Sequence, residues 1–107
     1  MQRFASVTRV HPEKLEDYKE LHAKPWAGVL ETLKKAGIRN YSIYLHGDLL
    51  FSYLEYHGSD WQAAQQMIAA DPITQEWWKL TDPCQKPFPS AKSGEMWSSM
   101  EPIFLME

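Results

Sequence analysis

The sequence predicts an α+β fold of the ferredoxin-like sandwich type, in which helices cover one face of an antiparallel sheet. Four segments have the alternation or the β-branched and aromatic content of strands, and two regions repeat apolar residues at helical spacing. In chain order they give β-α-β-β-α-β, the ferredoxin-like signature, with the second helix split in two. At 107 residues the chain has room for one domain, so we expect residues 1–107 to fold as a single unit.

The first strand and a broken helix are predicted in the N-terminal third. Residues 3–10 carry β-branched and aromatic side chains and are followed by Pro12, which cannot extend a central strand. From Glu13 the apolar spacing is helical as far as Gly37, a residue suited to the position after a helix end. Pro25 lacks an N–H group and crowds the preceding turn, so we expect a kink or a break there.

A β-hairpin follows. Residues 40–45 and 49–56 alternate in polarity on either side of a turn at residues 46–48. On the third strand, Phe51 and Tyr53 share one face. On the second strand, one face is predicted to carry Tyr41, Ile43 and Leu45.

The C-terminal part is predicted to contain two short helices, a loop and a last strand. Ser59 begins a capping box, and Asp71 precedes a proline at a second helix start. Residues 81–94 contain three prolines and are predicted to form a loop. Residues 97–105 are the expected last strand, with Pro102 marking a bulge or an edge position.

Composition excludes several classes of partner. The net charge of −3 gives no attraction to phosphate backbones or anionic lipid, so neither nucleic acid nor a membrane is expected as a partner. Cys84 is the single cysteine and cannot form an intrachain disulfide. No run of residues is long and apolar enough to span a bilayer. We therefore expect a cytoplasmic protein.

The aromatic content points to a covered sheet face. Five Trp, five Tyr and four Phe in so short a chain fill a core or line a ligand site. Phe51 and Tyr53 are predicted on the sheet face that the helices leave bare, and such a face in water needs a partner. We therefore expect a homodimer whose sheets or edges meet.

His22 is the candidate for acid–base chemistry among four histidines. An imidazole titrates near pH of about 6.5, which suits proton transfer. His11, His46 and His57 fall in turns or at a strand end and are most simply solvated. His22 lies on the apolar stripe of the first helix, one turn after Tyr18. An interior histidine is more often a hydrogen-bonded core residue than a catalyst, but the break at the nearby proline favours a site.

Two neighbouring tryptophans are the other unusual feature. Trp77 and Trp78 project about 100° apart on a helix, so both cannot enter one core. Trp78 therefore either walls a pocket or packs under the proline-rich loop.

Cofactor chemistry has no support in the sequence. There is no His-x-x-x-His pair, no cysteine pair and no glycine-rich phosphate loop, so we expect neither a metal nor another cofactor. The RNA-recognition sandwich shares the predicted topology, but its basic, glycine-containing motif is missing around the aromatic residues of the third strand.

Over essentially its whole length the chain resembles the L-rhamnose mutarotases. Four stretches carry the resemblance: Tyr18 with His22, residues 40–45, Trp77-Trp78-Lys79 and residues 101–105. The tandem tryptophan is the most specific of them. The resemblance implies a dimeric ferredoxin-like fold of the dimeric α/β barrel type, and an enzyme that interconverts the α and β anomers of L-rhamnose without metal or cofactor.

The resemblance also implies roles for individual residues. The histidine matching His22 is the proton donor of that family, and the sugar is contacted by the residues matching Tyr18, Tyr41, Trp77 and Trp78. The match is loosest over residues 83–97, which leaves open the choice among rhamnose, fucose and a related sugar. Two alternatives remain: a dimeric α+β barrel monooxygenase, by fold analogy, and a non-catalytic domain that binds a small molecule.

Overall fold

The computed structural model describes residues 1–107 and confirms the predicted α+β class. The strands are β1 (Gln2–Val10), β2 (Ile38–His46), β3 (Leu49–Tyr56), β4 (Gln85–Lys86) and β5 (Ser98–Met100). The helices are α1 (Leu15–Ala23), α2 (Ala27–Lys35), α3 (Trp61–Ala70) and α4 (Pro72–Thr81), with single 3₁₀ turns at η1 (Pro12–Lys14) and η2 (Asp82–Cys84).

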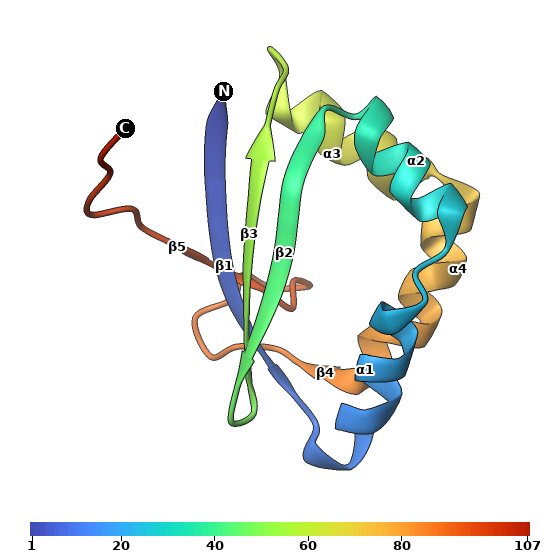
Figure 1. Ribbon diagram of the computed structural model, residues 1–107. Coiled ribbons are helices and arrows are strands. Elements are labelled where there is room, and N and C mark those ends of the chain that lie inside the picture. Colours follow the sequence, from blue (N-terminus) through green and yellow to red (C-terminus); the bar gives the residue numbers. More distant parts are fainter.

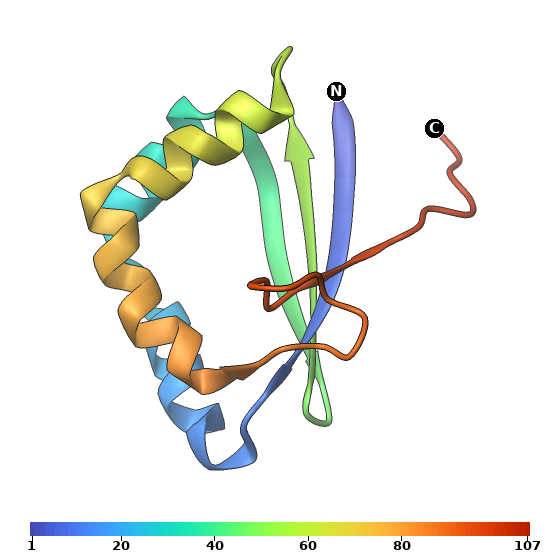
Figure 2. The same cartoon turned by 180° about the vertical axis from the view of Figure 1, so that it is seen from behind.

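The sheet has the ferredoxin-like order β2-β3-β1-β4, and every neighbouring pair is antiparallel. β5 also pairs with β1, so the fourth strand of the sheet is divided into two pieces along one edge. All four helices lie on one side of the curved sheet, as Figure 1 shows and Figure 2 confirms from behind. The site described below lies in the space between these two layers.

The helical region breaks at Pro25, as predicted. α1 ends at Ala23 and α2 begins at Ala27, so the proline lies between two helices and removes no hydrogen bond from either. Gly37 follows the second helix with a φ of 92°, a conformation that only glycine adopts without steric cost.

A β-bulge at Asn40 sets the faces of β2. Asn40 has a φ of 51°, and the pairing with β3 shifts register between Arg39 and Ser42. Asparagine tolerates this left-handed conformation better than most residues, and its Nδ2 donates a hydrogen bond to Glu55 Oε1 at 2.7 Å. Beyond the bulge, Ile43 is on the helix-covered face, where it packs against the cluster formed by Val10, Tyr18, Leu50 and Cys84.

The predicted last strand is too long. Only Ser98–Met100 pairs with β1, and the pairing stops at Ala5 opposite Met100. In that register the next residues would place Pro102 opposite Arg3, and a proline has no N–H to donate. The predicted loop over residues 81–94 is also partly wrong, because it contains η2 and the two-residue strand β4.

The predicted cap of α3 is wrong by one residue. The helix begins at Trp61, and Asp60 rather than Ser59 accepts the hydrogen bond from Ala63 N, at 3.1 Å. Asp60 is held in this place because its own N–H donates to the Tyr56 hydroxyl at 2.9 Å. The other predicted cap is confirmed, since the Asp71 carboxylate accepts from Thr74 N at 2.9 Å.

The core between sheet and helices has two apolar clusters, one toward each end of the sheet. One contains Val10, Tyr18, Leu50 and Cys84. The other contains Ala36, Ile38, Tyr56 and Ala64. Between them, Ser6 and Ser52 face each other across β1 and β3 and share a hydrogen bond of 2.6 Å.

Candidate active site

One cavity brings together all five residues that the sequence singled out. It has a volume of about 240 Å³ and lies beside the first of the two apolar clusters. Its walls come from α1, β2, α4 and the segment after α4, and they include Tyr18, His22, Tyr41, Trp77 and Trp78. Residues separated by up to 60 positions thus meet in one place because the sheet and the helices enclose it together.

Tyr18 and His22 reach the cavity from the same face of α1. They are one helical turn apart, and their rings stack with centroids 4.1 Å apart. The His22 Nδ1 atom lies 2.8 Å from the backbone oxygen of Tyr18. A carbonyl oxygen can only accept a hydrogen bond, so Nδ1 is the donor.

This hydrogen bond fixes the tautomer of His22. With the proton on Nδ1, a neutral ring has its lone pair on Nε2, and a charged ring has an acidic proton there. Nε2 is therefore the atom of His22 that can exchange a proton with a ligand. Such an arrangement is typical of a histidine in acid–base chemistry rather than one whose two nitrogens are both committed to the protein.

The tandem tryptophan divides between core and cavity wall. Trp77 is buried, and its ring packs in T-shaped pairs with those of His22 and Trp26, with centroids 5.4 Å and 5.3 Å away. Trp26 follows Pro25 directly, so the break between the helices supplies part of this aromatic packing. Trp78 is more exposed and lines the cavity beside Met96 of the proline-rich segment. Of the two interpretations of Trp78, this position agrees with the pocket wall.

The two tyrosines of the cavity keep their protons. Burial raises the pKa of Tyr18 well above its usual range, and negative charge on Tyr41, Cys84 or Asp82 raises it further. Tyr41 is exposed over part of its surface, but its phenol is surrounded by protein, and this desolvation raises its pKa as well. Both hydroxyls are therefore hydrogen-bond donors to a ligand and not bases.

Asp82 and Gln85 also line the cavity, and the sequence did not single them out. Desolvation raises the pKa of the Asp82 carboxyl, which makes this carboxylate a stronger base than usual. An aspartate before a proline at a helix end is a signal that could have drawn attention to residue 82. Nothing in the local pattern around residue 85 offers a comparable signal.

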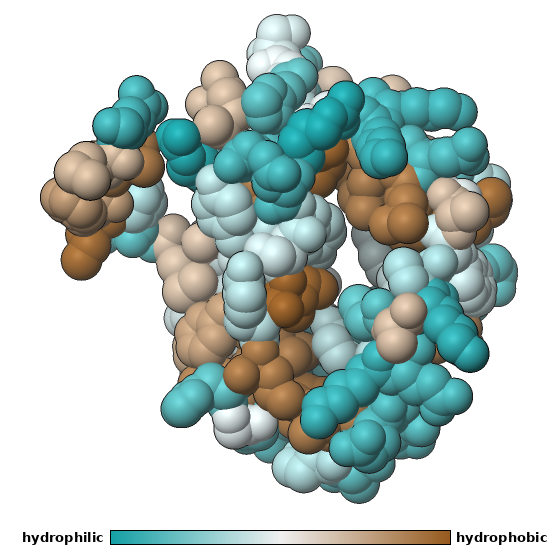
Figure 3. Space-filling view, in the orientation of Figure 1, coloured by the Kyte–Doolittle hydropathy of each residue, from teal (hydrophilic) through white to brown (hydrophobic).

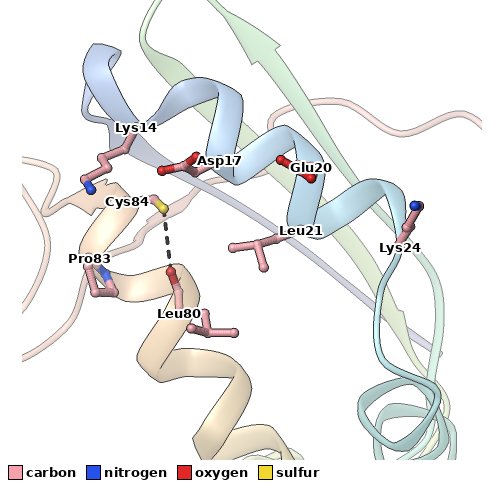
Figure 4. Close-up of a pocket in the computed structure, with 8 residues that line it drawn as sticks. All are labelled: Lys14, Asp17, Glu20, Leu21, Lys24, Leu80, Pro83 and Cys84. Atoms are coloured by element: carbon pink, nitrogen blue, oxygen red, sulfur yellow. Dashed lines mark hydrogen bonds between the residues drawn. The ribbon is translucent and has the colours of Figure 1, made fainter.

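A larger groove elsewhere lacks these features. It has a volume of about 420 Å³ and lies between α1 and the end of α4 (Figure 4). Its walls carry two lysines and two acidic residues, with none of the five predicted site residues. The Cys84 thiol at its edge donates to Leu80 O at 3.6 Å, and burial raises its pKa, so it is not an activated nucleophile.

The remaining histidines lie outside the cavity. His11 is 3.8 Å from the carboxylate of Glu13, and His57 is 3.6 Å from that of Glu55. His46 is exposed beside the hairpin turn. No three His, Cys, Asp or Glu side chains gather in an arrangement that could hold a metal ion. No helix combines the length and the apolar character needed to cross a bilayer.

Comparison with known proteins identifies the family. The model of the L-rhamnose mutarotase family matches residues 3–106. The L-rhamnose mutarotase of Listeria monocytogenes is 38% identical over 92 residues, which cover 84% of this chain and 86% of that protein. The crystal structure of L-rhamnose mutarotase FA22100 from Formosa agariphila superimposes with a TM-score of 0.79 and 23% identity, over the full length of both chains.

More distant structures share the fold alone. An antibiotic biosynthesis monooxygenase superimposes with a TM-score of 0.60 at 12% identity, covering 96% of this chain and 99% of that one. This explains why fold analogy suggested an oxygenase, and it gives that alternative no further support. The match over residues 3–106 shows instead that the chain belongs to the L-rhamnose mutarotase family.

Proposed function

We propose that this protein accelerates the exchange between the α and β anomers of L-rhamnose or a related 6-deoxy sugar, and that His22 transfers the proton. The observation that carries the proposal is the meeting of Tyr18, His22, Tyr41, Trp77 and Trp78 in one cavity, with Nε2 of His22 as the exchangeable atom. Family membership supports the same activity.

The reaction needs only proton transfer. A base takes the proton of the anomeric hydroxyl while an acid protonates the ring oxygen, and the C1–O5 bond breaks to give the open aldehyde. Rotation about C1–C2 followed by reclosure on the other face gives the second anomer, and the two protons return. Nothing is oxidised or reduced, and no covalent bond to the protein forms.

His22 fits the acid in this sequence. Its charged ring donates the Nε2 proton to the ring oxygen and recovers it on reclosure, while Nδ1 stays bonded to Tyr18 O. Their raised pKa values keep both tyrosines protonated, so neither is available as a base, and we assign to them the orientation of the sugar hydroxyls. Asp82 is the carboxylate that lines the cavity, and we propose that it accepts the anomeric proton.

The size of the cavity supports a monosaccharide. Pockets for drug-sized ligands start at about 300 Å³, and this cavity of about 240 Å³ is smaller. The ring of Trp78 offers a flat apolar surface to the C–H face of a pyranose. Ile43 and Met96 provide aliphatic walls for the methyl group of a 6-deoxy sugar.

The test is the approach to anomeric equilibrium. One pure anomer of L-rhamnose is mixed with the protein, and the anomeric proton signals are followed by NMR. We expect equilibration faster than in buffer, in proportion to the protein concentration. A sugar that binds, as shown by broadened ligand signals, but equilibrates at the buffer rate would identify a binding domain and contradict the proposal.

We also propose that the protein is a homodimer. The C-terminal residues stand clear of the sheet in Figure 1, and Figure 3 shows apolar atoms gathered on them. Ile103 exposes 91% and Phe104 83% of its surface. On the sheet, Phe51 and Tyr44 pair across the face that no helix covers. In a homodimer, the C-terminal residues of each chain can cover the bare sheet face of the other, so that both apolar surfaces are buried.

The oligomeric state tests this proposal. Sedimentation equilibrium should give twice the chain mass for the full chain and one chain mass for a variant with Ile103→Ser and Phe104→Ser. A single-chain mass for the unaltered protein at micromolar concentration would contradict it.

We further propose a cytoplasmic location, for which the support is the free thiol of Cys84.

A further inference from the structure

Gln85 is a buried polar residue that the fold leaves unpaired. It exposes 7% of its surface, and its Nε2 atom is buried without a hydrogen-bond partner in the protein. More than nine in ten buried polar groups in proteins are paired, because an unpaired one loses its water and gains nothing in return. The side chain lines the candidate active-site cavity, and rotation about its last bond would present Nε2 to a ligand there as the missing partner.

The position of Gln85 favours an apolar side chain. It begins β4 directly after η2, and it pairs with Val10 of β1. Paired residues on antiparallel strands project to the same face, so Gln85 shares the helix-covered face with Val10. Val10 itself packs in the cluster that contains Tyr18 and Cys84. Packing alone would be served better here by leucine or methionine than by an amide.

We infer that Gln85 determines substrate specificity by donating a hydrogen bond from Nε2 to one hydroxyl of the bound sugar. This inference rests on the proposed function and extends it to a residue outside the five that the family resemblance supplied. A sugar hydroxyl accepts one such bond, and the amide oxygen of the same side chain can accept from a neighbouring hydroxyl. A site built to hydrogen-bond a hydroxyl rejects analogues that lack it.

The first experiment replaces the amide by an apolar side chain of similar size. We expect Gln85→Leu to lower kcat/KM for L-rhamnose about ten-fold, since one hydrogen bond is lost in the complex. The melting temperature should stay equal or rise, because an unpaired buried amide is removed from the free protein. Gln85→Met makes the same test with a flexible side chain if leucine packs badly. Gln65→Leu, on the exposed face of α3, is the matched control and should leave kcat/KM unchanged.

The second experiment identifies the hydroxyl. Rates for L-rhamnose and its 2-deoxy, 3-deoxy and 4-deoxy analogues are measured with both proteins and divided by the uncatalysed rate of each sugar. For one analogue, the corrected rate with the unaltered protein should be about ten-fold lower than for L-rhamnose. Gln85→Leu should not lower the rate for that analogue any further. If both Gln85 variants keep the original kcat/KM, or discriminate every analogue as before, the inference is wrong while the proposed function stands. If the unaltered protein itself fails to accelerate equilibration, the proposed function fails and the inference with it.

Discussion

Two buried tyrosines at opposite ends of the core differ in a way that separates structure from function. Tyr18 and Tyr56 each expose 4% of their surface. The Tyr56 hydroxyl accepts a hydrogen bond from Asp60 N at 2.9 Å and so helps to begin α3. No hydrogen bond contributes to the raised pKa of Tyr18, whose side chain lines the cavity. The two tyrosines are therefore equally buried but have different roles, which are distinguished by whether the hydroxyl has a hydrogen-bond partner in the protein.

The surroundings of the two residues follow the same division. Around Tyr56, the ring of Trp61 packs against both Tyr56 and Phe4, stacked on Phe4 with centroids 4.3 Å apart. We call this the sealed end, because these three rings line none of the cavities described above. Around Tyr18, the cavity collects an imidazole, a carboxylate and an unpaired amide. The sealed end stabilises the fold. The end around Tyr18, which we call the open end, holds polar groups that lower the stability of the fold but can act on a ligand. The following predictions test this contrast, from the largest expected effect to the smallest.

Loss of the imidazole at the open end should have the largest effect on rate. We expect His22→Ala to reduce the enhancement of mutarotation by about 10² to 10⁴, the usual contribution of one acid–base group. His46→Ala, in the exposed hairpin, is the control and should keep full activity. Saturation-transfer NMR on equilibrated L-rhamnose measures both. Full activity in His22→Ala would remove the assigned proton donor.

The carboxylate at the open end should be needed for activity but unfavourable for stability. Desolvation raises the pKa of Asp82 although the residue is partly exposed to water, so the folded state binds the proton more tightly than the unfolded state does. Its contribution to the free energy of unfolding is present below the ordinary carboxyl pKa of about 4 and is lost as pH rises through the higher folded value. We therefore expect Asp82→Asn to lower the rate about ten-fold or more. The change in melting temperature caused by the substitution should be more favourable at pH 7 than at pH 3. A variant with lower stability at pH 7 would contradict this.

Removing each tyrosine hydroxyl should separate the two ends directly. Tyr56→Phe leaves the N–H of Asp60 without its acceptor, and we expect the free energy of unfolding to fall by about 1 kcal/mol with kcat/KM unchanged. Tyr18→Phe should do the reverse, with stability kept and kcat/KM lowered several-fold. Urea unfolding and mutarotation rates give the two quantities. Equal losses of stability in the two variants would mean that the Tyr18 hydroxyl is structural.

The smallest effect concerns the helix start at the sealed end. Asp60→Ala should lower the free energy of unfolding by about 1 kcal/mol, as expected for loss of an N-cap, whereas Ser59→Ala should change it by less than about 0.3 kcal/mol. Urea unfolding of both variants is the measurement. A larger loss of stability in Ser59→Ala than in Asp60→Ala would show that Ser59 is the cap, as the sequence predicted.

The regular parts of the fold could be predicted because their side-chain periods are long enough to detect. The hairpin strands, the break at Pro25 and the cap at Asp71 all follow from local chemistry. The cap of α3 was misplaced because serine and aspartate stand side by side and cap equally well. The last strand is shorter than predicted because apolar residues continue past Pro102, where pairing with β1 does not.

The site was predicted only where a residue type was unusual or matched the family. A histidine on an apolar stripe and a tandem tryptophan are conspicuous in one dimension. Gln85 is not, because a two-residue strand has no period to detect, and Asp82 is marked only by the proline that follows it at a helix end. Their importance comes from tertiary placement at the cavity, which local sequence does not encode.

The bulge at Asn40 has a consequence for how this chain can vary in length. Two residues of β2, Asn40 and Tyr41, stand opposite the single Leu54 of β3. Deleting one of these two residues would leave a regular ladder, in which Ile43 still lies opposite Ser52 and Leu45 opposite Leu50 on the helix-covered face. The strand can therefore lose one residue at the bulge without exchanging its two faces. Alignments of relatives should place a one-residue gap in β2 at residues 40 and 41 rather than elsewhere in the strand.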